Sequence, residues 1–180
     1  MKRLAMLLLP ILLWASLGWA GAALDAFTVR DATVHAYFSP NGGCTDAIVE
    51  ALGQARTTVK VQAYSFTSAP IAKALVDAHK RGVLVEVLLD KSQRTEKYSS
   101  ADFLAHAGIP TRIDAQHRIA HNKIMVIDGA VVITGSFNFS KAAEEKNAEN
   151  LLVIHDPKLA ERYLEYWRGH QGHSVAYEGR

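Results

Sequence analysis

The chain has 180 residues, of which 49% are apolar and 21% charged, with 20 basic residues against 18 acidic ones. This composition is that of an ordinary globular domain, and it excludes a disordered chain, a collagen-like repeat and a disulfide scaffold. Lys2 and Arg3 precede an uncharged run, and without them the 20 basic residues become 18, so the formal charge of +2 falls to zero. A strongly basic coat for nonspecific binding of nucleic acid is therefore excluded as well.

The first 22 residues have the layout of a cleavable secretory signal peptide. The positive start at Lys2 and Arg3 is followed by a Leu-rich apolar run, 4–14, and by small residues at 20–23. We expect cleavage after about residues 20–23 and a mature chain that is periplasmic or secreted, without stable membrane association. The alternative is an uncleaved anchor, because the run at 4–24 is long enough to span a bilayer.

Strand-like and helix-like segments alternate along the rest of the chain. Apolar and β-branched runs predict strands at 34–38, 58–66, 83–89, 111–114, 123–127, 130–134 and 151–155. Apolar residues at helical spacing predict helices at 45–56, 70–81, 99–107 and from 157 to about 167. Asp128-Gly129 predicts a hairpin, and Asp156-Pro157 predicts the start of the last helix. We therefore expect one α/β domain over residues 23–180, an α/β/α sandwich whose mixed sheet has parallel crossovers first and a hairpin later.

The single cysteine, Cys44, limits the covalent and metal chemistry of the chain. It excludes an internal disulfide and a cysteine-based zinc site. A bridge between two chains is one interpretation, and a small buried apolar residue is the one we favour. No metal site is expected, because the histidines are scattered and four carboxylates lack a familiar ligand spacing: Asp128, Glu144, Glu145 and Glu149.

Four polar residues fall at one end of the predicted hairpin. His121 and Lys123 are two residues apart on a strand and share a face, and Ser136 and Asn138 do the same after the next strand. Lys, Ser and Asn are donors that suit phosphate oxygens, and imidazole is a nucleophile or an acid/base near neutral pH. Together these residues predict phosphoryl transfer without a metal.

Other charged residues near this segment are candidates for structural or substrate-binding roles. Asp128 is seven residues from His121, an odd number, so on a strand the two side chains would point to opposite faces. We therefore expect Asp128 to cap the hairpin turn. Basic side chains follow the strand at 83–89 or precede His121, and they are candidates for a groove that tracks phosphates. The alternative for them is a solvated loop. They are Lys91, Arg94, Lys97 and Arg118.

The pattern His121-x-Lys123-x4-Asp128, followed by Gly135-Ser136-x-Asn138, resembles the motif of the phospholipase D superfamily. Gly135 and Asp128 correspond to structural positions of that motif. Three upstream segments resemble the small Nuc-type bacterial endonucleases of the superfamily: 42–45, 64–67 and 81–83. The resemblance covers about residues 34–167 and implies one phospholipase D-like domain per chain, with no cofactor.

The resemblance also implies a catalytic arrangement. The chain carries a single motif, whereas this fold needs two per active site, so a homodimer with a shared site on its two-fold axis is implied. One His121 would form a phosphohistidine while His121 of the partner subunit protonates the leaving oxygen. Lys123, Ser136 and Asn138 would hold the phosphoryl oxygens. Glu149 matches the carboxylate that orients the histidine.

The function that these features favour is that of a nonspecific endonuclease acting on DNA, with RNA as a further substrate. The main alternative is a phospholipase D-type hydrolase of phospholipid head groups. That activity would favour an amphipathic membrane-docking stretch, and the sequence shows none outside the leader. A third class, a protein that binds nucleic acid without turnover, is disfavoured by the intact His121 and Lys123.

Overall fold

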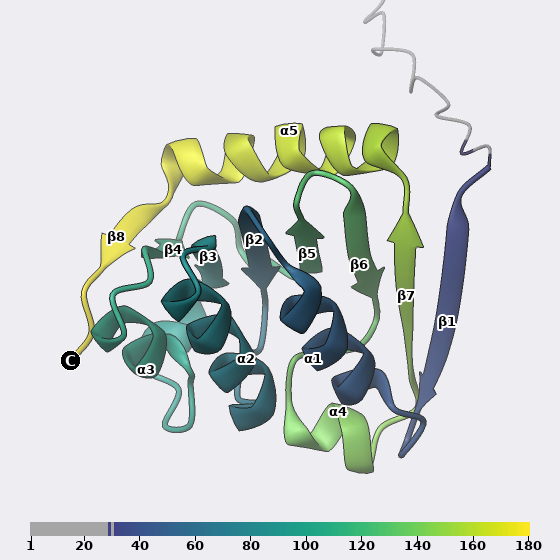
Figure 1. Ribbon diagram of the computed structural model, residues 1–180. Coiled ribbons are helices and arrows are strands. Elements are labelled where there is room, and N and C mark those ends of the chain that lie inside the picture. Colours follow the sequence, from purple (N-terminus) through teal and green to yellow (C-terminus); the bar gives the residue numbers. More distant parts are fainter. Residues whose placement is uncertain (1–28, 30) are drawn as a thin grey trace, which may run out of the picture.

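An eight-stranded mixed sheet forms the centre of the computed structural model, which describes residue 29 and residues 31–180 (Figure 1). The predicted signal peptide at 1–22 lies outside the described residues. The strand order is β1-β7-β6-β5-β2-β3-β4-β8. The strands are β1 (Thr33–Ser39), β2 (Thr58–Ala63), β3 (Leu84–Asp90), β4 (Thr111–Asp114), β5 (Lys123–Ile127), β6 (Val131–Gly135), β7 (Glu149–His155) and β8 (Val175–Tyr177).

The direction of the strands changes part-way across the sheet. β2, β3 and β4 are parallel, and the helical crossovers α2 (Ala69–Lys80) and α3 (Ala101–His106) connect them. β5, β6 and β7 then pair antiparallel with one another, and β5 also pairs antiparallel with β2. Parallel strands need long crossovers, whereas antiparallel strands can be joined by short turns. The long helical connections therefore occur between the parallel strands β2, β3 and β4, and the short turn occurs between the antiparallel strands β5 and β6. The predicted mixed sheet is confirmed.

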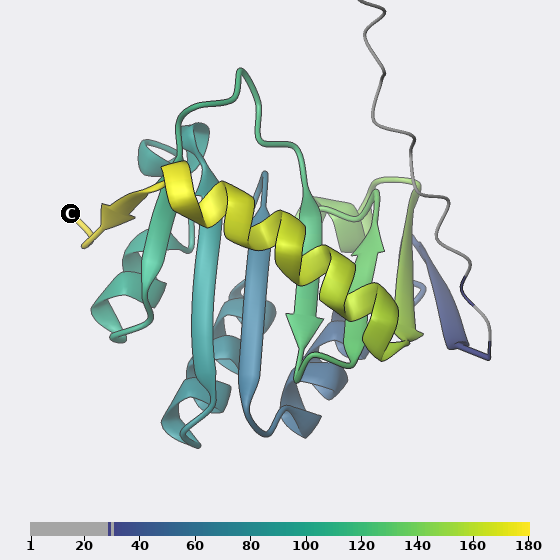
Figure 2. The same ribbon diagram turned by 90° about the horizontal axis from the view of Figure 1, so that it is seen from above.

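Helices cover both faces of the sheet, which confirms the predicted α/β/α sandwich. α1 (Cys44–Gln54), α2 and α3 lie on one face, and α5 (Pro157–His173) crosses the other (Figure 2). β5 contributes to both layers: Met125 and Ile127 belong to the main core, whereas Ile124 and Val126 pack in a smaller cluster with residues of α5. A strand buried on both faces has a continuous run of apolar residues, which is why β5 is apolar from Ile124 to Ile127.

The structure differs from the predicted elements at a few places. α5 continues to His173 instead of ending near Trp167, although glycines at 169 and 172 are poor helix formers. Trp167 and His170 are both buried on this helix, and their packing supports the extra turn. Three short elements were not predicted: the 3-10 helix η1 (Lys91–Arg94), α4 (Lys141–Glu145) and β8. None of the described helices is long and apolar enough to cross a bilayer.

The hairpin between β5 and β6 forms as predicted, but Asp128 does not act as expected. Asp128 and Gly129 have positive φ angles of 53° and 62°, as the turn requires. The Asp128 carboxylate accepts hydrogen bonds of 2.8–2.9 Å from the backbone N–H groups of residues 56–58. It therefore caps the turn that leads into β2 rather than its own hairpin, because the pairing of β2 with β5 brings the two turns together.

Removal of this cap is expected to destabilise the fold. Asp128→Ala leaves three backbone donors unpaired, and we expect a loss of about 2–3 kcal/mol in the free energy of unfolding. Burial raises the pKa of Asp128, but the N–H donors outweigh it and hold the pKa below its usual value. The charge then stabilises the fold above about pH 4, the ordinary range of the unfolded carboxyl, and this stabilisation is lost as the pH falls through the lower folded pKa. Urea unfolding at pH 7 and pH 3 measures both effects, and an unchanged pH dependence in Asp128→Asn would contradict this role of the charge.

Candidate active site

The predicted catalytic residues come together at one rim of the sheet, at the top of Figure 2. β2 and β6 end at this rim, and β5 and β7 begin there, since Ala63 pairs with Lys123 and Gly135 pairs with Leu151. An antiparallel hairpin places the start of one strand beside the end of the next. The polar residues that flank β5, β6 and β7 therefore lie at the same edge.

The ring of Tyr64 lies close to both His121 and Lys123. The exposed ring of His121 lies 4.6 Å from the Tyr64 ring, centroid to centroid. The Lys123 side chain is buried, its Nζ lies 5.0 Å from the same ring, and it donates a 2.9 Å hydrogen bond to the carbonyl of His121. Burial lowers the pKa of Lys123 to about 8, and the negative charge of Glu149 offsets this only in part. The result is a desolvated ammonium beside an accessible imidazole.

Ser136 is held in place by Asn150. Its hydroxyl accepts a 3.0 Å hydrogen bond from the Asn150 N–H, and its own N–H donates at 2.8 Å to the Asn150 side chain. The hydroxyl hydrogen of Ser136 is left to donate to a ligand. The side-chain oxygen of Asn138 is buried and has no hydrogen-bond partner within the described chain.

Glu149 lies at the rim, and its hydrogen bonds go to Asn147 and Ser39. Its carboxylate accepts a 3.0 Å hydrogen bond from the side chain of Asn147, and its N–H donates to the hydroxyl of Ser39. Among the residues that the structure describes, no hydrogen bond joins it to His121. Its influence is on the charge of Lys123, whose pKa it raises.

Gly135 is a position at which the backbone tolerates no side chain. Its φ is 148°, and a Cβ added there would lie 2.3 Å from the carbonyl oxygen of Asn150. Gly135→Ala is expected to destabilise the protein by about 2–4 kcal/mol and to displace Ser136, because strain and overpacking add. Thermal unfolding measures the loss. Gly53→Ala is the control, since a Cβ at Gly53 of α1 meets no atom within 4 Å and is expected to stabilise by about 0.5–1 kcal/mol.

A pocket of about 350 Å³ opens at this rim between β5 and α5. His121 and Lys123 contribute to its wall together with Arg162, Tyr163 and Tyr166. That the three α5 residues belong to this site was not predicted from the sequence. The sequence predicts the helix that carries them, but a helical pattern does not indicate which end of a sheet the helix will cross.

The candidate substrate-binding cations are exposed on segments that follow β3 and β4. Lys91 donates a 3.1 Å hydrogen bond to the carbonyl of His117, in the loop 115–122 that also carries Arg118. The buried Asp90 side chain accepts a 2.7 Å hydrogen bond from the N–H of Ala120 and so fixes the same loop. Arg94 is exposed in η1, and Lys97 lies over the ring of Tyr98. Lys91 and Arg118 are thereby placed on adjoining segments, one of which also carries His121.

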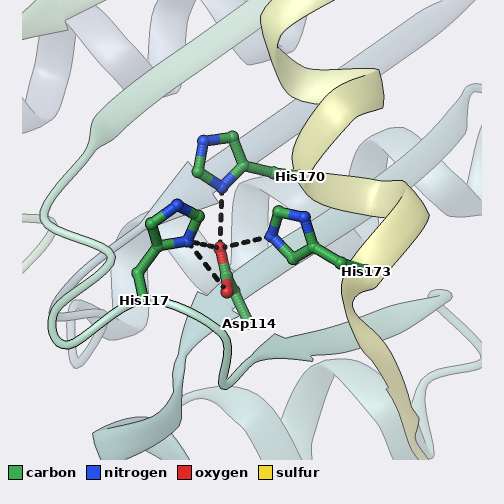
Figure 3. Close-up of side chains that lie close together, drawn as sticks. All are labelled: Asp114, His117, His170 and His173. Carbon is green, nitrogen blue, oxygen red and sulfur yellow. Dashed lines mark hydrogen bonds and ion pairs between the residues drawn. The ribbon is translucent and has the colours of Figure 1, made fainter.

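The expectation that the histidines are scattered is wrong for three of them. His117, His170 and His173 gather around the carboxylate of Asp114 at the far end of the loop 115–122 (Figure 3). His117 is more than 50 residues away in sequence from His170 and His173, and they meet because α5 crosses the sheet and ends above β4. Cys44, in contrast, is buried, and burial together with the charge of Glu144 raises the pKa of its thiol to about 11.

Comparison with known proteins identifies the family. Residues 48–170 match the family described as cardiolipin synthase, PLD-like domain, which is well over half of the chain. The chain belongs to the phospholipase D superfamily. The predicted resemblance to this superfamily is confirmed.

Individual relatives agree with this assignment. A protein named phospholipase D from Rickettsia prowazekii is 40% identical over 155 residues, covering 84% of this chain and 76% of the relative. Its counterpart in Rickettsia bellii is 45% identical over 130 residues, but the match spans only 65% of that relative. The mitochondrial cardiolipin hydrolase of Danio rerio is 31% identical over 125 residues, which is 67% of this chain and 55% of the relative.

Solved structures share the fold. Nuc from Salmonella typhimurium, a phospholipase D family member, superposes with a TM-score of 0.80 at 41% identity and covers 83% of this chain and 100% of its own. NucT from Helicobacter pylori superposes with a TM-score of 0.76 at 24% identity, covering 82% of this chain and all of its own. The predicted fold class is confirmed.

Proposed function

We propose that this superfamily member is a metal-independent phosphodiesterase that cleaves DNA, and as a further substrate RNA, at a site shared by two copies of the chain. The observation that carries the proposal is the buried ammonium of Lys123 beside the exposed imidazole of His121. Within the described chain, Lys123 forms no ion pair, and its one hydrogen bond goes to a backbone carbonyl. A buried cation with unused N–H donors suits a phosphate oxygen.

The chemistry is a double displacement at phosphorus. A ring nitrogen of one His121 attacks the phosphorus, the P–N bond forms, and the bond to the leaving oxygen breaks. The partner subunit's His121 gives its proton to that oxygen. It then takes a proton from a water molecule, which attacks the phosphorus and breaks the P–N bond. Lys123 and the hydroxyl of Ser136 would stabilise the charge on the phosphoryl oxygens.

A shared site supplies what one chain lacks. The mechanism needs two imidazoles, one neutral and one protonated. Among the residues that the structure describes, His121 is the one histidine that lines the rim pocket with Lys123. His121 is exposed, so it is accessible to a second copy. A two-fold axis at this rim would bring two His121 and two Lys123 side chains to one phosphate.

DNA is favoured as the substrate by the 41% identity with Nuc and by the resemblance to Nuc-type endonucleases. The exposed Lys91, Arg94 and Arg118 give a path for neighbouring phosphates. The second candidate is a phospholipid or cardiolipin, and it is favoured by the names of relatives in Rickettsia and Danio rerio.

Incubation of the purified protein with supercoiled plasmid DNA, phosphatidylcholine vesicles and cardiolipin vesicles, each in excess EDTA, tests the proposal. We expect nicking of DNA in EDTA and an acid-labile phosphoryl group on His121 in quenched reactions, found by mass spectrometry. Turnover of lipid without cleavage of DNA would replace the substrate with the second candidate. Cleavage without a phosphohistidine would overturn the mechanism.

A further inference from the structure

Three imidazoles and one carboxylate form a compact cluster at the end of α5 (Figure 3). Asp114 ends β4 and its side chain is fully buried. The facing atoms are Nδ1 of His117, Nδ1 of His170 and Nε2 of His173, at 3.1, 2.7 and 3.2 Å from Oδ2 of Asp114. All four ligand atoms lie within 4.8 Å of one another. The three ring nitrogens therefore converge on one carboxylate oxygen.

Hydrogen bonding alone does not account for this convergence. A carboxylate oxygen offers two lone pairs, whereas three ring nitrogens point at Oδ2. Nε2 of His173 is buried and, despite its 3.2 Å separation from Oδ2, has no hydrogen-bond partner of acceptable geometry among the described residues. The three rings also surround the oxygen almost evenly, with centroids 4.7, 5.2 and 5.2 Å apart. An orphaned imidazole nitrogen aimed into a polar cluster indicates a missing ligand.

We propose that Asp114, His117, His170 and His173 bind a divalent first-row transition metal ion, with Zn²⁺ the ion of best fit. Three nitrogens and one carboxylate oxygen complete a tetrahedral set, and bond lengths of about 2.0–2.1 Å place tetrahedral ligands about 3.3 Å apart. The separations of 2.7–3.2 Å from Oδ2 need only a small expansion to reach this value. The predominance of imidazole disfavours Mg²⁺ and Ca²⁺, which prefer oxygen ligands.

The ion would have a structural role. Four protein ligands close the coordination sphere, which is typical of structural zinc sites. The site ties the loop 115–122 to both β4 and α5, and this loop carries Arg118 and His121. Tyr166 of the pocket wall links the two regions, since its ring lies 4.5 Å from that of His170 and its hydroxyl accepts a hydrogen bond from Asn122. The ion would thus stabilise the wall of the active site without taking part in the chemistry.

Binding can be tested independently of the proposed activity, in the His121→Ala background. We expect one Co²⁺ per chain with the visible absorption of a tetrahedral nitrogen and oxygen site, displaced by Zn²⁺. At a free Zn²⁺ concentration about 100-fold above its Kd, the Tm should rise by about 5–10 °C, and Mg²⁺ should leave it unchanged.

Two ligand variants and one control complete the experiment. His117→Ala removes a side chain that is 43% exposed, so the fold should survive, and His173→Gln preserves bulk at the helix end. Each is expected to weaken Co²⁺ binding by about 100-fold. His106→Ala, an exposed histidine of α3, should bind as the parent does. Absence of the tetrahedral spectrum in the parent, or an equal loss in the control, would overturn the site.

Discussion

His121→Ala is expected to lower kcat for DNA cleavage by about 10⁴-fold or more, because it removes both the nucleophile and the general acid of the shared site. The side chain is exposed and its ring contact is with Tyr64, so the Tm should change little. Steady-state cleavage of plasmid DNA and thermal unfolding measure the two quantities. His35→Ala, an exposed histidine on β1, is the matched control and should keep full activity.

The shared site makes a quantitative prediction for mixed dimers. When wild-type chains are refolded with increasing amounts of His121→Ala chains, each mixed dimer has one imidazole and is inactive. Activity should therefore fall as the square of the wild-type fraction. A linear decrease, or full activity in a protein shown to be monomeric, would contradict a site built from two chains.

Lys123→Met is expected to raise the stability of the protein and to lower its activity. Burial holds the pKa of Lys123 near 8, so the fold bears the cost of keeping an ammonium desolvated at neutral pH. We expect the variant to be more stable than the wild type by about 1–3 kcal/mol at pH 7. Cleavage should fall by about 10²–10³-fold, because a donor to the transition-state phosphoryl group is lost. Lys146→Met, an exposed lysine, should change neither quantity appreciably.

The dependence of stability on pH tests whether the buried ammonium of Lys123 destabilises the fold. The folded pKa of Lys123 lies below the value of about 10.4 in the unfolded chain, so between pH 8 and about 10.4 the unfolded state binds more protons. The stability of the wild type should therefore rise with pH through this window, and its difference from Lys123→Met should narrow. Urea unfolding at pH 7 and pH 10 measures this, and a difference independent of pH would contradict it. For activity, kcat/KM should fall above about pH 8, and Lys123→Arg should move this limb to higher pH.

The features that could be predicted from the sequence are those that depend on patterns of neighbouring residues. The alternation and apolar runs of β2, β3 and β5 reflect burial of each strand within the sheet, and Asp128-Gly129 marks a turn that needs positive φ angles. Lys123 begins β5 and His121 lies two residues earlier, in the preceding loop rather than on the predicted strand. Their closeness in the sequence is enough to place both residues at the start of β5. α4, η1 and β8 were missed because they are only three to five residues long and tertiary contacts stabilise them.

The order of the elements, the hairpin and the segment with His121 and Lys123 could be predicted from the sequence, because each depends on residues close together in the chain. Which distant side chains meet depends instead on the tertiary structure. The path of α5 across the sheet places Arg162, Tyr163 and Tyr166 in the wall of the candidate active site. The same path brings His170 to Asp114, 56 residues away in sequence. Such contacts depend on how two packed surfaces fit together, and no local period in the sequence encodes that fit.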